Sequence, residues 1–145
     1  MVSLSMGASV CFFAKSLYAG LICFLSGFLL DIDHIIEYIV HYGPRDLTIK
    51  NVYLACAQTH EQEGEYQFRK LYLIFHSTEI AIVLWVLALY TKNVYLFVSA
   101  LGYSTHLILD YMGNISIFRP QSYFVIWRAI NKFQTNKLLR KSYTK

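Results

Sequence analysis

Apolar residues are grouped in three long runs, at residues 8–30, 71–90 and 94–112, and polar stretches separate these runs. Each run is close to the roughly 20 residues that a helix needs to cross the hydrocarbon core of a bilayer. Only helices and closed barrels satisfy all backbone polar groups inside lipid. The pattern therefore predicts an all-α protein, a multi-pass transmembrane helical bundle with about three spans.

The first run has two alternative readings. A secretory signal peptide would begin with a charged segment and end at a small-residue cleavage site, and this run has neither before Asp31. A retained span is therefore the favoured interpretation. Lys15 lies inside the run, and its side chain could extend to one surface, which would move the buried window to residues 16–38.

The polar stretches carry their own helix signals. In the loop at 31–70, Gly43-Pro44 marks a turn, and Thr48 is placed to cap a short helix that ends at His60. In the basic tail at 119–145, one helical face is apolar and aromatic, whereas Arg128 and Lys132 lie on the other face. This predicts an interfacial amphipathic helix on an anionic leaflet, with packing against the bundle as the alternative. The apolar face consists of Tyr123, Ile126, Trp127, Ile130 and Phe133.

Composition supports a lipid environment. Of 145 residues, 56% are hydrophobic and 15% are charged, and the mean hydropathy is +0.39, far from the balance of a soluble domain. Two prolines and no Ser/Gly-rich linker predict a single integral-membrane domain, residues 1–145. The net charge of +4 needs no nucleic-acid partner, since acidic lipids attract basic segments equally well.

The distribution of basic residues predicts the orientation. Eleven of the 13 Lys and Arg residues lie in the loop at 31–70 or in the tail, and only Lys15 and Lys92 lie elsewhere. Loops rich in Lys and Arg stay on the cytoplasmic side. We therefore expect a cell-membrane protein with the loop and the C-terminus in the cytoplasm and the N-terminus outside.

The cysteines indicate neither disulfides nor a thiolate metal site. Cys11, Cys23 and Cys56 are odd in number and include no closely spaced pair. On a single helix, Cys11 and Cys23 would lie about 18 Å apart, too far for a disulfide. Buried, reduced thiols are the favoured interpretation.

Three groups of ionisable residues lie within the apolar runs or at their ends. Their spacing of three or four residues places each pair on one face of its helix, and the predicted topology brings all three to the cytoplasmic membrane face. Small residues on the same faces permit close helix contact. The ionisable groups are Asp31, Asp33 and His34; His76 and Glu79; and His106 and Asp110, and the small residues are Gly20, Gly27, Ser99, Gly102 and Gly113.

Carboxylates near hydrocarbon are costly unless a cation compensates them, and the inner parts of the second and third runs contain no Lys or Arg. This favours metal binding over two alternatives, a proton or ion pathway and structural polar packing. Imidazole and carboxylate ligands suit zinc first, with Mn, Fe or Ni as alternatives. The surplus of ligands leaves room for a second ion, or for Glu79 or Asp33 as a general base.

Three short motifs carry a family resemblance. Residues 27–34, Gly-Phe-Leu-Leu-Asp-Ile-Asp-His, resemble the first signature of the YdjM-like membrane-bound metal-dependent hydrolases, and Phe75-His-Ser77 resembles the second. Residues 102–110, Gly-Tyr-Ser-Thr-His-Leu-Ile-Leu-Asp, resemble the third. The resemblance implies a metal site at Asp31, Asp33, His34, His76, His106 and Asp110. Leu30 replaces the family's usual Pro, and its Arg before the second motif is absent.

The sequence thus predicts a membrane-bound metal-dependent hydrolase, in which metal-activated water attacks an ester or phosphoester, with lipids among the candidate substrates. The alternative is a non-catalytic membrane subunit that binds or transports metal ions through the same ligands. Three spans are too few for an obvious conduit, so this alternative requires a homo-oligomer.

Overall fold

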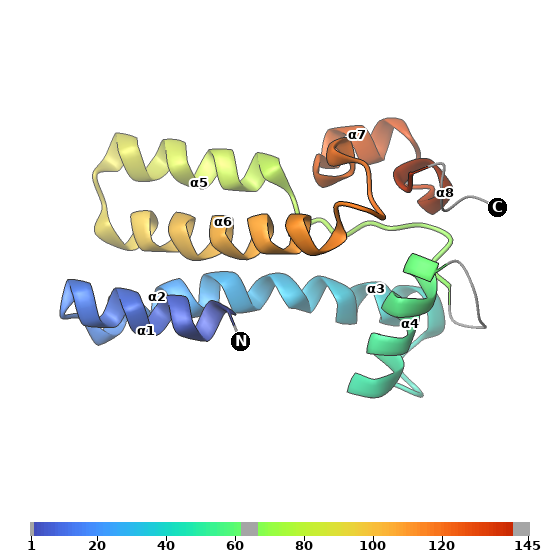
Figure 1. The fold of residues 1–145 in the computed structure, drawn as a ribbon, viewed down its shortest axis with the longest axis horizontal. Helices are drawn as coiled ribbons and strands as arrows, with labels where there is room; N and C mark the ends of the chain where they lie inside the picture. The colour runs from blue at the N-terminus through green and yellow to red at the C-terminus, as the bar shows by residue number, and fades with distance from the viewer. Residues whose placement is uncertain (1, 62–66, 141–145) are drawn as a thin grey trace. The chain divides into compact units, whose positions relative to one another are not determined.

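The computed structural model describes residues 2–61 and 67–140. These residues are helical, with two isolated β-bridges and no strand among them. The chain divides into two compact units, Met1–Asp31 with Phe75–Met112 and Ile32–Ile74 with Gly113–Lys145. Figure 1 labels the α-helices. The elements are α1 (Val2–Ala14), α2 (Leu17–Phe28), η1 (Leu29–Asp31), α3 (Ile32–Tyr42), α4 (Ile49–Glu61), α5 (Thr78–Thr91), α6 (Val94–Asn114), η2 (Pro120–Tyr123), α7 (Val125–Ile130) and α8 (Thr135–Leu138).

The first unit begins with a helical hairpin. The prediction of one helix over 8–30 is wrong, because α1 ends at Ala14 and α2 begins at Leu17. Lys15 takes a left-handed backbone conformation with φ 48°, and Ser16 caps α2 by accepting a hydrogen bond from the Ala19 N–H at 3.3 Å. The alternative frame starting at residue 16 agrees with the start of α2.

Two glycines bring the hairpin's backbones together. A Cβ on Gly7 would lie 2.8 Å from the Gly20 carbonyl oxygen, and one on Gly20 would lie 2.7 Å from that of Gly7. No larger residue fits at either position without displacing a helix. The hairpin also places Cys11 and Cys23 on different helices, so their expected position on one helix is wrong. Both are free thiols.

A second hairpin, α5 and α6, completes the first unit. The third apolar run is helical as predicted, over Val94–Asn114. The second run is helical only from Thr78, not from residue 71, because Ser77 accepts a hydrogen bond from the Ile80 N–H and caps α5 there. Trp85 of α5 donates a 2.9 Å hydrogen bond to Ser104 of α6, which ties the hairpin together.

Helix α6 lies between α5 and α2 (Figure 1) and packs on α2 at a glycine. A Cβ on Gly102 would lie 2.1 Å from the Cys23 carbonyl oxygen, and Cys23 is fully buried. Gly27 faces Gly102 and Ser3. The prediction that small residues permit close helix contact is confirmed at Gly27 and Gly102. It is wrong for Gly113, where an added Cβ would meet no atom within 4 Å.

The combination of length and apolar composition that a membrane span needs is found once among the described residues. The helical stretch Leu17–Tyr42 is long and apolar enough to cross a bilayer, whereas the apolar helices Ser3–Ala14 and Thr78–Thr91 are shorter. At 14 residues, α5 is about 21 Å long, against a hydrocarbon core of about 30 Å. The multi-pass part of the predicted architecture therefore stays a proposal, while its all-α class is established.

The second unit confirms the predicted loop helix. Helix α4 begins at Ile49, and the Thr48 hydroxyl accepts a 3.1 Å hydrogen bond from the Asn51 N–H. The turn at Gly43 is also confirmed. Gly43 has φ +78° and donates its N–H to the Ile39 carbonyl at 2.8 Å, which ends α3.

Two buried charged side chains hold residues 72–73 in a non-helical conformation. The Glu37 carboxylate accepts the N–H groups of Tyr72 and Leu73, at 3.0 and 3.3 Å. Arg128 donates to the carbonyls of the same two residues, at 2.8 and 2.6 Å. Leu73 has φ 37°, outside the range of a right-handed helix. Four backbone groups that a helix would pair internally are thus paired with side chains.

The predicted continuous amphipathic helix of the tail is wrong. The described part of the tail forms η2, α7 and α8, each six residues or shorter. Arg128, expected on the polar face, is buried, and so is Tyr123 from the expected apolar face. Ile126 and Ile130 are exposed as predicted. Lys141 and Lys145 lie outside the described residues.

Substitution of Gly102 tests the contact between α2 and α6. Gly102→Ala places a methyl group against backbone atoms of Cys23, and we expect a loss of about 1–3 kcal/mol in the free energy of unfolding. Gly113→Ala is the matched control on the same helix, and helix propensity alone predicts a gain of about 0.5–1 kcal/mol. Chemical denaturation of the purified protein measures both. Equal stability of the two variants would contradict the packing described.

Candidate metal centre

Three of the predicted ligands converge in the first unit. Asp31, His76 and His106 each offer one ligand atom, and these atoms lie within 4.8 Å of one another. Asp31 is the last residue of η1, the short helix that follows α2. His76 comes directly before Ser77, the residue that caps α5. His106 lies on α6. Three segments of this unit therefore each contribute one residue to the cluster.

One pair of ligand atoms in the cluster has the separation expected for two ligands of one metal ion. The His106 Nε2 lies 3.3 Å from an Asp31 carboxylate oxygen. Two ligands of a tetrahedral ion with bonds of about 2.0–2.1 Å lie about 3.3 Å apart. The His76 and His106 rings lie 5.8 Å apart, centroid to centroid. His76 is 3% exposed, whereas the Asp31 side chain is 54% exposed, so the cluster opens on the Asp31 side.

Ser3 of α1 contacts the far side of the His106 ring. Its hydroxyl oxygen lies 3.3 Å from His106 Nδ1, while Nε2 faces Asp31. The hairpin at Lys15 brings Ser3 to this end of the unit. The N-terminus was expected at the opposite end from the site, and this expectation is wrong, because α1 is an extra helix that returns the chain.

Tyr103 fixes the backbone around His76. Its hydroxyl accepts a hydrogen bond from the Ser77 N–H at 3.3 Å and lies 2.9 Å from the Ser77 carbonyl oxygen. It also contacts the Phe75 carbonyl. Tyr103 and Ser77 are buried. Helix α6 therefore carries one ligand, His106, and also holds the segment that carries another.

Sequence reasoning missed both hydroxyls. Tyr103 lies three residues before His106, on the same helical face, and this spacing was the one available signal. Ser3 offered none, because its contact with His106 joins residues 103 positions apart.

The remaining predicted residues are not members of the cluster. Asp110 lies one turn after His106 on α6, and Glu79 lies half-buried in the first turn of α5. Asp33 and His34 belong to the second unit, where His34 Nδ1 lies 3.4 Å from the Cys56 sulfur. The ligand set that the structure brings together thus has three members rather than six. It can hold one ion, and a second ion has no comparable cluster among the described residues.

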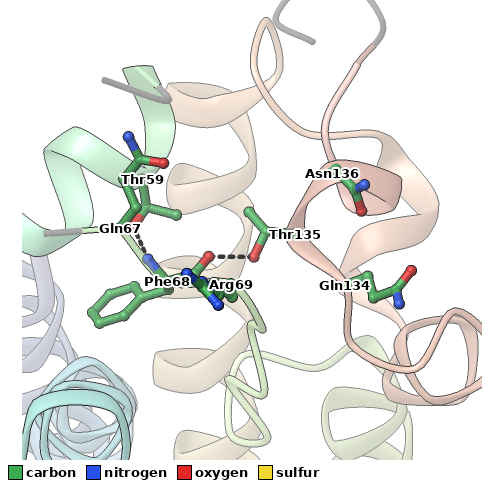
Figure 2. A pocket seen from close by; sticks show the side chains of 7 residues that line it. All are labelled: Thr59, Gln67, Phe68, Arg69, Gln134, Thr135 and Asn136. Atoms are coloured by element: carbon green, nitrogen blue, oxygen red, sulfur yellow. Dashed lines mark hydrogen bonds between the residues drawn. The ribbon is translucent and has the colours of Figure 1, made fainter. Parts of the chain in front are cut away.

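The second unit contains a separate polar cavity of about 360 Å³ (Figure 2). Two of its lining threonines bind the backbone of Phe68: Thr59 accepts the Phe68 N–H at 2.8 Å, and Thr135 donates to the Phe68 carbonyl at 2.6 Å. None of the predicted ligands lines it. The lining residues are Thr59, Gln67, Phe68, Arg69, Gln134, Thr135 and Asn136.

On a bound ion, two imidazoles and one carboxylate would leave coordination positions open to water or substrate. This is the arrangement of catalytic zinc sites, whereas structural zinc sites are closed by four protein ligands. The same donor set also suits iron, manganese and nickel. No sulfur belongs to the cluster.

Comparisons with protein-family models, curated proteins and solved structures gave no match. The resemblance to the YdjM-like hydrolases therefore rests on the three motifs alone. Each motif contributes one residue to the cluster: Asp31 from the first, His76 from the second and His106 from the third.

Metal content of variants tests the three-residue cluster. His76→Ala and His106→Ala should each lose most of the bound metal, and the double variant should be little worse than either, because ligands of one ion act as a unit. Elemental analysis of detergent-purified protein measures this.

Asp110→Ala is the contrasting variant. The six-residue set predicts that it loses metal as the histidine variants do, whereas the three-residue cluster predicts that it keeps most of it. Full occupancy in both His76→Ala and His106→Ala would show that the cluster binds no metal.

Proposed function

We propose that this protein is a membrane-bound metal-dependent hydrolase that cleaves an ester or phosphoester, with lipids as the substrate class. The observation that carries the proposal is the convergence of Asp31, His76 and His106, from three separate segments, on a volume that suits one ion. Zinc is the proposed metal, and its role is Lewis acidity and the activation of water at neutral pH.

The chain's own residues supply binding and orientation. His76 and His106 act as neutral ligands, and Asp31 contributes one negative charge that offsets part of the ion's charge. The exposed Asp31 side of the cluster is where water and substrate can enter. The buried His76 side has its backbone fixed by Tyr103, which limits movement of the ligands during turnover.

Glu79 is our proposed general base. Glu79 lies three residues after His76, in the first turn of α5. A carboxylate near a metal ion, but not itself a ligand, can accept the proton of an attacking water.

The exposed side chains of α5 support a membrane location. This helix is apolar on all sides, yet much of it is exposed rather than covered by the rest of the unit. A helix that is apolar all round needs either burial or lipid. The exposed residues are Ile82, Val83, Val86, Leu87, Leu89 and Tyr90. We therefore place the first unit in the bilayer, with the metal centre at the cytoplasmic face as the Lys and Arg distribution suggests.

A membrane subunit that binds or transports metal ions is the second candidate, and the same cluster supports it. It requires oligomerisation, because Leu17–Tyr42 alone among the described stretches is long and apolar enough to cross a membrane. Turnover separates the two candidates, since both require metal.

Hydrolysis of phosphodiester lipids in mixed micelles tests the enzyme proposal. Zinc-loaded protein should release product, and chelation or His76→Ala should abolish it. Glu79→Gln should retain metal but lose at least about 100-fold in rate, the contribution of a general base. Metal flux into vesicles without hydrolysis would instead establish the transport alternative.

A charge scan tests the lipid contact of α5. Val86 is 59% exposed on α5, and Ile49 is 91% exposed on α4. A lysine at the centre of a helix in lipid costs about 2.5–3.5 kcal/mol on the insertion scale, whereas one in water costs little. Val86→Lys should therefore reduce the membrane-inserted yield, and Ile49→Lys should not. Equal yields would place the outer face of α5 in water.

A further inference from the structure

Ser3 lies outside the three motifs, yet its side chain contacts a ligand of the metal centre. The Ser3 hydroxyl oxygen is 3.3 Å from His106 Nδ1, and the other nitrogen of this ring is the one that faces Asp31. The two nitrogens of His106 therefore have different partners, one from α1 and one from the end of α2.

This arrangement determines which nitrogen binds the ion. A histidine that coordinates metal through Nε2 carries its proton on Nδ1, and a hydrogen-bond acceptor there fixes both the tautomer and the ring orientation. A serine hydroxyl can accept this hydrogen bond. With Nδ1–H donated to Ser3, the lone pair of Nε2 is directed at the cluster.

The position of Ser3 depends on Gly27. A Cβ at Gly27 would lie 2.8 Å from the Ser3 hydroxyl oxygen and 3.3 Å from the Ser3 Cβ. The first turn of α1 can therefore pack against residue 27 only because this residue is a glycine. The helical hairpin thus has a role at the site as well as in packing.

We propose that Ser3 is a positioning residue of the metal centre, which holds His106 in the tautomer and orientation that present Nε2 to the ion. This inference rests on the proposed metal-dependent function. In this proposal α1 supplies Ser3, which accepts a hydrogen bond from the ring nitrogen of His106 on α6 that faces away from the ion.

The test compares two serine substitutions on α1 in the purified full-length protein. Ser3→Ala removes the contact with His106, whereas Ser9→Ala removes a hydroxyl that donates to the Ser5 carbonyl within its own helix. Zinc affinity is measured by competition with a chelator, and the visible spectrum of the cobalt(II) form reports the coordination. Thermal unfolding of the metal-free proteins measures stability separately.

Ser3→Ala should bind zinc about 10–100-fold more weakly than the original protein and should shift the cobalt(II) bands. Ser9→Ala should match the original protein in both, and metal-free stability should be alike for all three proteins. Unchanged affinity and spectrum in Ser3→Ala would overturn this inference and leave the metal centre intact.

Two other outcomes also count against it. An affinity loss in Ser3→Ala that only parallels a loss of metal-free stability would assign Ser3 a packing role and overturn the inference. Absence of zinc or cobalt binding by the original protein would overturn both the inference and the proposed function.

Discussion

The backbone contact between α2 and α6 is the constraint on which the site depends. Gly102 has no side chain, and its backbone lies directly against Cys23 of α2. Because the two helices are this close, His106, one turn beyond Gly102, comes within 3.3 Å of Asp31 at the end of η1. A methyl group at Gly102 would separate these helices by more than the few tenths of an ångström that a metal–ligand bond tolerates. The packing of α2 on α6 and the proposed coordination therefore depend on the same close approach.

Polar contacts with backbone groups set the path of the chain toward His76. In the second unit, Glu37 and Arg128 pair with the four backbone groups of residues 72–73. In the first unit, Ser77 caps α5 and Tyr103 contacts the backbone of residues 75–77. Buried charges are costly unless they are hydrogen-bonded, and these are. The late start of α5 leaves His76 outside the helix, where its ring can reach the cluster.

The proposed function requires both a lipid environment and access of water to the metal centre, and the first unit offers features that suit each. A bilayer-embedded unit can hold a carboxylate and two imidazoles at low cost when a divalent ion neutralises the charge. The exposed apolar side chains of α5 suit lipid, and the exposed side of Asp31 suits access by water. A lipid ester or phosphoester would meet both environments at once. This shared location is our reason for proposing lipids as the substrate class.

The sequence by itself determined the all-α class, the α4 and α6 helices, the turn at Gly43 and three true members of the cluster. These features depend on local signals: hydrophobic runs, caps, glycines and residues spaced by one helical turn. The hairpin at Lys15 and the late start of α5 could not be read from the sequence, because one lysine or one serine within an apolar run is a weak break. Contacts between residues far apart in sequence decided them, Gly7 with Gly20 and Glu37 with residues 72–73. The same holds for the site. Local spacing identified the residue types that could bind metal, but only the approach of separate helices selected Asp31, His76 and His106 and added Ser3 and Tyr103 around them.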